Sequence, residues 1–132
     1  MTGLVFPGSR CVGDADGLFG GLRFGFDEGL MRAEWIFSKD FGGPPGIVHG
    51  GALASVIDEA MTALIFHLFG MGFTAELNVR YIAPVPIDQK VIISSGLEDH
   101  KGRKVRLKGK ICLEDGTVTN EAEALFILMT GQ

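Results

Sequence analysis

The sequence predicts an α+β domain in which a curled antiparallel β-sheet wraps around one long central α-helix. Apolar and polar residues alternate in two runs before the middle of the chain and in four runs after it, which is typical of strands. Between these runs the apolar period lengthens to that of a helix. Consecutive strands joined by short turns pair antiparallel, and a helix that is apolar nearly all round is expected to be surrounded by them.

The composition indicates one folded domain. The chain has 132 residues, 46% of them hydrophobic, and a net charge of −4, which excludes an intrinsically disordered protein. Its 20 glycines follow no three-residue period, which excludes a collagen. Residues 1–20 show no sustained period and are expected to form an extended lead-in, followed by a single domain over residues 21–132.

The first half of the domain is predicted to contain a hairpin, a loop and the helix. Residues 22–27 and 31–38 alternate in hydrophobicity on either side of a turn sequence that ends at Gly29. The glycines and prolines of residues 39–48 predict a loop, because they continue neither a strand nor a helix. Residues 51–69 then carry the apolar stripe of the central helix, and glycines follow where it ends.

Four further strands are predicted after the helix. Each of them alternates in hydrophobicity, and polar turns or prolines separate them from one another. They cover residues 74–81, 91–97, 105–113 and 118–129. The predicted order along the chain is therefore β-β-α-β-β-β-β, with no internal repeat and no linker.

The charges and the cysteines exclude several classes of function. With 12 Lys and Arg against 16 Asp and Glu, the chain has no basic field that would bind nucleic acid. Cys11 and Cys112 have neither metal-ligand nor disulfide-framework spacing, so we expect no metal site and a reducing, cytoplasmic location. The N-terminus lacks a signal-peptide pattern, and the longest apolar run contains Asp58 and Glu59, so no membrane span is expected.

The start of the predicted helix is the candidate active site. His49 is followed by Gly50 and Gly51, which let a ligand approach the backbone closely. The N–H groups of a first helical turn have no acceptor within the helix, so they favour an anion or a developing oxyanion. Further along the helix lie Asp58 and Glu59, and burying an unpaired carboxylate is costly, so such an acid usually has a partner or a catalytic role.

The spacing of these groups predicts a site between two chains. Gly50 and Asp58 are eight residues apart, which is about 12 Å along a helix. Catalytic groups must each come within about 3 Å of the reacting atoms, so one helix cannot supply both groups to one carbonyl. A two-fold dimer can, because it lays Asp58 of one chain beside Gly50 of the other. We therefore expect a homodimer or homotetramer.

Two segments carry a resemblance to a known family. They are GIVHGGALASVIDEAM at residues 46–61 and TAELNVRYIAPVP at residues 74–86. Both resemble the PaaI-like, phenylacetate-pathway family of hotdog-fold acyl-CoA thioesterases, and the resemblance covers roughly residues 11–129. It implies the hotdog fold and hydrolysis of an acyl-CoA thioester to a free acid and CoA. Because coenzyme A is part of the substrate, no separate cofactor is implied.

The resemblance also implies roles for four residues of the site. Asp58 stands at the position of the catalytic carboxylate, which acts as general base on water or as nucleophile. Gly50 stands where a backbone N–H from the other subunit polarises the thioester carbonyl. Thr74 stands where some members use a serine to orient the water or the carboxylate. His49 is a further candidate, although in the family this histidine is typically a structural part of the loop and helix start.

Alternative interpretations remain for several features. Gly51 and Glu59 are candidate substrate contacts, but helix packing and a structural acid explain them as well. Six basic residues within residues 101–110 indicate either a solvated strand face or a contact to the phosphates of CoA. Gly43 stands where some relatives have an asparagine donor. Two other functions also remain open, a hotdog hydratase or dehydratase on acyl thioesters and a non-catalytic acyl-CoA-binding module.

Overall fold

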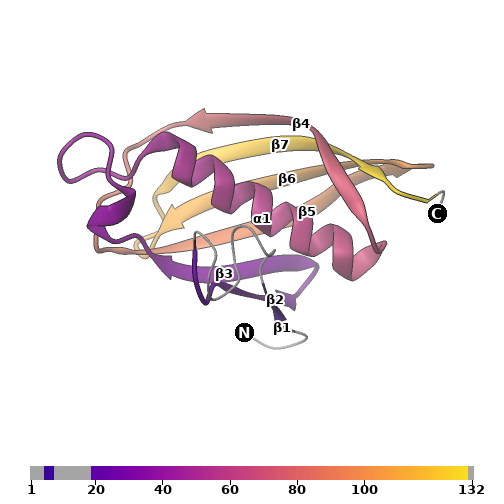
Figure 1. Cartoon of the computed structure of the whole chain (residues 1–132), viewed down its shortest axis with the longest axis horizontal. Coiled ribbons are helices and arrows are strands. Elements are labelled where there is room, and N and C mark those ends of the chain that lie inside the picture. Colours follow the sequence, from indigo (N-terminus) through magenta and orange to yellow (C-terminus); the bar gives the residue numbers. More distant parts are fainter. Residues whose placement is uncertain (1–4, 8–18, 131–132) are drawn as a thin grey trace.

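A computed structural model of the chain describes residues 5–7 and 19–130. This part of the chain forms a seven-stranded antiparallel sheet, one long α-helix and a short 3-10 helix (Figure 1). The elements are β1 (Val5–Pro7), β2 (Arg23–Asp27), β3 (Leu30–Ile36), η1 (Lys39–Phe41), α1 (Gly50–Leu68), β4 (Gly72–Tyr81), β5 (Lys90–Lys101), β6 (Lys104–Leu113) and β7 (Val118–Leu128). The strand order β1-β2-β3-β5-β6-β7-β4 leaves β1 and β4 at the two edges of the sheet.

The predicted architecture is confirmed, and the predicted order of helix and strands is found from β2 to β7, with β1 as an additional strand before it. The helix is shifted by one residue at each end from the predicted range 51–69. Within the predicted lead-in, β1 pairs with β2 and Phe19 is fully buried, so packing of the domain extends N-terminal of residue 21. Residues 1–4 and 8–18, which include Cys11, lie outside the described part of the chain.

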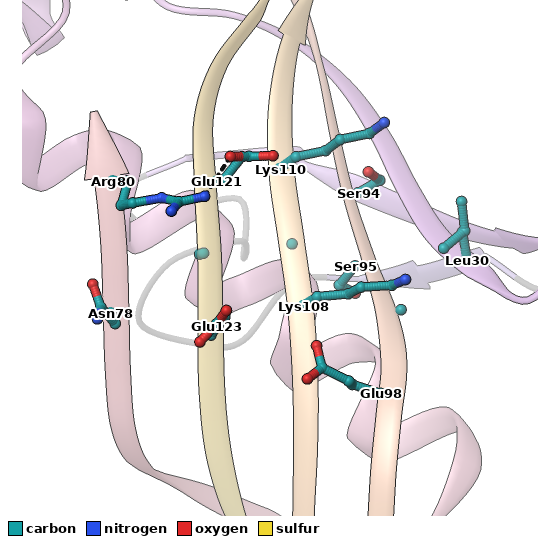
Figure 2. Close-up of a pocket in the computed structure, with 13 residues that line it drawn as sticks. Leu30, Asn78, Arg80, Ser94, Ser95, Glu98, Lys108, Lys110, Glu121 and Glu123 are labelled. Atoms are coloured by element: carbon teal, nitrogen blue, oxygen red, sulfur yellow. Dashed lines mark hydrogen bonds and ion pairs between the residues drawn. The ribbon is translucent and has the colours of Figure 1, made fainter. Parts of the chain in front are cut away.

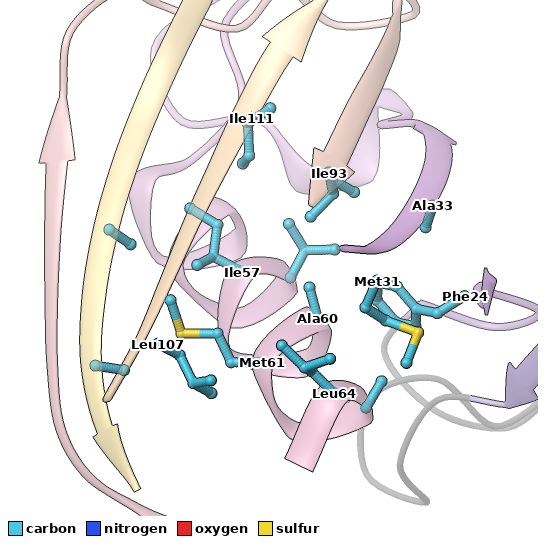
Figure 3. Packing of buried hydrophobic residues seen from close by; sticks show 14 of the residues in the cluster. Phe24, Met31, Ala33, Ile57, Ala60, Met61, Leu64, Ile93, Leu107 and Ile111 are labelled. Carbon is cyan, nitrogen blue, oxygen red and sulfur yellow. The ribbon is translucent and has the colours of Figure 1, made fainter. Parts of the chain in front are cut away.

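The core lies between α1 and the inner face of the sheet (Figure 3). Ile57 and Met61 of the helix pack toward β6, where Gly109 faces them. A Cβ atom at Gly109 would come within 3.0 Å of the Met61 Cε, so helix and sheet approach more closely here than a larger residue permits. The absence of a side chain at this strand position thus sets the depth at which α1 sits against the sheet.

The expectation that the helix is surrounded on all sides is wrong for the single chain. By length and composition α1 could cross a membrane, but in this fold half of its most apolar window is buried, because one of its sides packs on the sheet. The other side carries the half-buried Asp58 and Thr62 and the 50% exposed Phe66. Leu68, the last residue of the helix, is 40% exposed. The sheet covers only the side that faces it, so part of the apolar surface expected in the core remains uncovered.

A bulge in β4 determines which of its side chains face the helix. The pairing with β7 shifts between Thr74 and Glu76, which makes Ala75 an extra residue in the strand. Thr74 lies opposite Phe126 and Tyr81 lies opposite Asn120, and both partners are fully buried. Thr74 and Tyr81 therefore share the inner face of the sheet.

Candidate active site

The first turn of α1 is held by the histidine that precedes it. His49 is the N-cap residue, and its Nδ1 accepts a hydrogen bond of 2.9 Å from the Gly51 N–H. A Cβ atom at Gly51 would lie 3.1 Å from this nitrogen, so the cap favours a glycine at this position. The structure thus gives the predicted site residues His49 and Gly51 a role in starting the helix.

The glycine-rich loop before the helix folds back against the cap residue. The His49 N–H donates to the Phe41 carbonyl oxygen at 2.7 Å, and the Gly43 N–H donates to the Ile47 carbonyl oxygen at 2.9 Å. A Cβ atom at Gly43 would come within 3.2 Å of the His49 Cα, which is tighter than ordinary packing. The closely folded loop therefore favours a glycine at position 43, where some relatives have asparagine.

The N–H group of Gly50 stands at the start of the helix. Gly50 is the first residue of α1, and none of the described residues accepts a hydrogen bond from this N–H. Its carbonyl oxygen accepts a 2.7 Å hydrogen bond from the Tyr81 hydroxyl. The free N–H lies at the positive end of the helix dipole, which suits it to bind a developing negative charge.

Asp58 lies two turns further along the uncovered side of α1. The Thr74 Oγ1 donates to its Oδ1 at 2.7 Å, so the bulge in β4 brings together two predicted site residues that are 16 positions apart. None of the described residues is seen to donate to the other carboxylate oxygen, Oδ2. Within one chain Asp58 and Gly50 remain on the same helix, about 12 Å apart along its axis.

Glu59 occupies a different side of the helix from Asp58. Successive residues of an α-helix point about 100° apart, and Glu59 is only 4% exposed while Asp58 is half-buried. This burial separates the predicted substrate contact Glu59 from the face that carries Asp58. Among the described residues no three His, Cys, Asp or Glu side chains gather as metal ligands, and Cys112 is a free thiol.

The basic residues of β6 lie on the opposite face of the sheet from Asp58. Lys108 and Lys110 stand opposite Glu123 and Glu121 of β7 and line a cavity of about 450 Å³ on the outer face (Figure 2). Gly109, which lies between the two lysines in β6, faces α1. Because side chains alternate along a strand, the lysines on either side of it point away from the helix. These lysines belong to a solvated surface of mixed charge, which favours the solvated-face interpretation over a contact to CoA beside Asp58.

Comparison with protein families shows to which family the chain belongs. The model of the thioesterase superfamily matches residues 45–120, which contain the helix start, Asp58 and Thr74. The chain belongs to the thioesterase superfamily. The acyl-coenzyme A thioesterase THEM4 of Xenopus laevis is 43% identical over 86 residues, which are 64% of this chain and 39% of the frog protein. The chain spans only 37% and 48% of the mouse and cattle relatives of the same name.

Solved structures confirm the predicted hotdog fold of this superfamily member. The thioesterase superfamily protein RHA08564 is 29% identical, with a TM-score of 0.79 over 85% of this chain and 56% of that chain. The Escherichia coli PaaI protein from the phenylacetic acid degradation operon has a TM-score of 0.78 over 85% of this chain and 82% of its own. At 12% identity the likeness to PaaI shows the fold alone.

One contact of the site was not predicted from the sequence. Tyr81 reaches Gly50 across 31 positions of the chain, and no local pattern announces a contact of that range. The only signals are that Tyr81 is the single tyrosine of the sequence and that it stands at an inward position of a strand.

Proposed function

We propose that this chain hydrolyses an acyl-CoA thioester to a free carboxylic acid and CoA. The observation that carries the proposal is the Asp58 carboxylate, held by the Thr74 hydroxyl on the uncovered side of α1 in a member of the thioesterase superfamily. The relatives named acyl-coenzyme A thioesterase support the same substrate class.

A second copy of the chain completes the active site in this proposal. β4 is an open edge strand of ten residues, whose outer backbone groups have no strand to pair with in the described part of the chain. Large apolar side chains are exposed along this strand and the adjoining part of the fold, and they are Phe66, Leu68, Met71, Phe73, Tyr81 and Ile82. Pairing of β4 with the β4 of a second copy covers both the unpaired backbone and the apolar surface.

Such pairing also brings the Asp58 carboxylate of one chain close to the Gly50 N–H of the other. Antiparallel strands related by a two-fold axis near the middle of β4 place the Thr74 end of one strand beside the Tyr81 end of the other. Thr74 holds Asp58 and Tyr81 holds Gly50. The dimer therefore lays Asp58 of one chain beside Gly50 of the partner subunit.

The chemistry follows from this arrangement. The Asp58 carboxylate takes a proton from water, and the resulting hydroxide attacks the thioester carbonyl carbon. The oxygen of the tetrahedral intermediate accepts a hydrogen bond from the Gly50 N–H of the partner subunit. The carbon–sulfur bond then breaks, the carbonyl reforms as the free acid, and CoA leaves as a thiolate that takes up the proton. Direct attack by Asp58 is the other route, and it uses the same carboxylate and the same donor.

A panel of acyl-CoA esters with detection of released thiol tests the proposal. We expect Asp58→Asn to lower kcat by about 10²–10⁴ with the fold intact, because Asn keeps an oxygen that accepts from Thr74. Glu123→Gln on the outer face is the matched control and should retain activity. Binding of the esters without thiol release would instead support a binding module, and dehydration of a 3-hydroxyacyl-CoA would support a dehydratase.

Mixed dimers test whether the site lies between chains. Asp58→Asn and a Gly50 variant without the N–H should each keep about 1% of the native activity or less when alone. In a mixed dimer, the intact Asp58 of one chain faces the intact Gly50 of the other, so an equal mixture should regain about a quarter of the native activity. No recovery in dimers shown to have exchanged subunits would contradict the cross-chain site.

A further inference from the structure

The start of α1 is held from the sheet by one aromatic side chain. The Tyr81 hydroxyl donates to the Gly50 carbonyl oxygen at 2.7 Å. A Cβ atom at Gly50 would lie 3.4 Å from the Tyr81 Cε1 and 3.5 Å from its Cζ, so the ring also packs on the Gly50 Cα. Tyr81 thereby contacts the residue whose N–H is the proposed oxyanion donor.

The peptide group that joins the two glycines of the helix start is bound at both ends. Its carbonyl oxygen, from Gly50, accepts from Tyr81, and its N–H, from Gly51, donates to the His49 Nδ1 at 2.9 Å. Hydrogen bonds at the two ends of one peptide group polarise it in the same direction and reinforce each other. Two consecutive glycines have more backbone freedom than any other pair, so these two bonds restrict a segment that is intrinsically mobile.

We propose that Tyr81 is the positioning residue of the oxyanion donor. Its hydroxyl and ring hold the carbonyl and the Cα of Gly50. The Gly50 N–H lies in the preceding peptide group, whose carbonyl oxygen, from His49, accepts from the Ala52 and Leu53 N–H groups, so Tyr81 restrains the Cα about which this N–H is aimed at the substrate. A donor helps most when it is in place before the charge develops. The inference rests on the proposed thioesterase function, and it assigns to Tyr81 the same task for Gly50 that Thr74 performs for Asp58.

Tyr81→Phe is the informative variant, because it removes the hydroxyl and keeps the ring that packs on Gly50. We expect kcat to fall roughly threefold to tenfold, as loss of one neutral hydrogen bond does, while KM changes less than about twofold. Tyr81→Leu should cost more, because it removes the ring as well. Arg80→Gln is the matched control, since Arg80 lies next in the strand but bonds Glu121 on the outer face.

A spectroscopic measurement separates positioning from a merely structural role. The probe is a ketone analogue of the best ester, in which a methylene group replaces the sulfur and the carbonyl survives. In the native enzyme its carbonyl stretch should move to lower frequency on binding, and in Tyr81→Phe this shift should shrink. A saturated thioether analogue, which has no carbonyl, should bind both proteins equally.

Hydrogen exchange tests the same contact without any substrate. The Gly51 amide should exchange faster in Tyr81→Phe than in the native protein, and amides at the C-terminal end of α1 should not change. An unchanged kcat in Tyr81→Phe, an effect on KM alone, or an unaltered carbonyl shift would each overturn the inference. Failure of the proposed function is distinguishable, because in that case the native protein and Arg80→Gln release no thiol from any ester.

Discussion

Replacement of Gly50 by proline removes one hydrogen-bond donor and leaves the surrounding fold in place. Gly50 is the first residue of α1, where proline is well tolerated because its fixed backbone angle suits a helix start. The preceding residue, His49, has a ψ of 136°, which is the conformation that a following proline requires. The new Cβ atom would lie 3.4 Å from the Tyr81 ring, an ordinary contact distance.

The expected loss is that of one oxyanion donor. Removal of such a donor costs about 2.7–4 kcal/mol of transition-state stabilisation, which lowers kcat by roughly 10²–10³. Gly50→Ala is the matched control, because it adds the same Cβ atom and retains the N–H. We expect Gly50→Pro to be at least as stable as Gly50→Ala, since proline reduces the entropy of the unfolded chain and thereby stabilises the fold by about 0.4–1 kcal/mol.

The assay is thiol release from the best acyl-CoA ester, with kcat and KM measured for the native protein and both variants. Thermal unfolding and size-exclusion chromatography establish that each variant is folded and has the native oligomeric state. If folded Gly50→Pro hydrolyses the ester as fast as Gly50→Ala, the Gly50 N–H is not the oxyanion donor, and the start of α1 does not stabilise the oxyanion.

Three further substitutions test other contacts of the fold and the site. Thr74→Val should lower kcat by roughly 10- to 100-fold, because it deletes a hydrogen bond to the Asp58 carboxylate, and Thr74→Ser should restore most of the activity in the thiol-release assay. His49→Ala should lower the free energy of unfolding by about 0.5–2 kcal/mol through loss of the cap on the Gly51 N–H, and His49→Asn should recover much of it in urea titrations. Gly109→Ala should destabilise the fold by about 1–3 kcal/mol, because its Cβ would overpack the helix–sheet contact, and an unchanged urea midpoint would show that α1 can shift away.

The sequence was sufficient to predict the regular elements of the fold but not its irregular ones. The periodicity located α1 to within one residue at each end, since a stripe repeated over several turns averages out local noise. It missed β1, whose three residues are too few to show a period. It also missed the bulge at Ala75, because the extra residue follows from pairing with β7 and leaves no mark in the local sequence.

The candidate site was predictable where a motif is local and unpredictable where the contact is distant. The helix start and Asp58 lie within one continuous motif, and the family resemblance added Thr74, which the structure brings to Asp58. The packing of Tyr81 on Gly50 depends on how β4 crosses α1, which only the folded chain defines. The exposure of Phe66 was likewise hidden, because an apolar helix position looks the same whether its own chain or a second copy covers it.

The bulge at Ala75 puts the two β4 side chains that contact the proposed catalytic groups on the same face of the strand. Thr74 and Tyr81 are seven positions apart, and in a regular strand residues separated by an odd number point to opposite faces. One extra residue restores the same face, so that both hydroxyls reach α1, one at Asp58 and the other at Gly50. Because β4 is also the open edge, the strand that would join two copies is the strand that orients both groups. A change of register in the proposed dimer would therefore move the carboxylate and the donor apart without altering either chain, so under the proposed function we expect the pairing of β4 itself to determine activity.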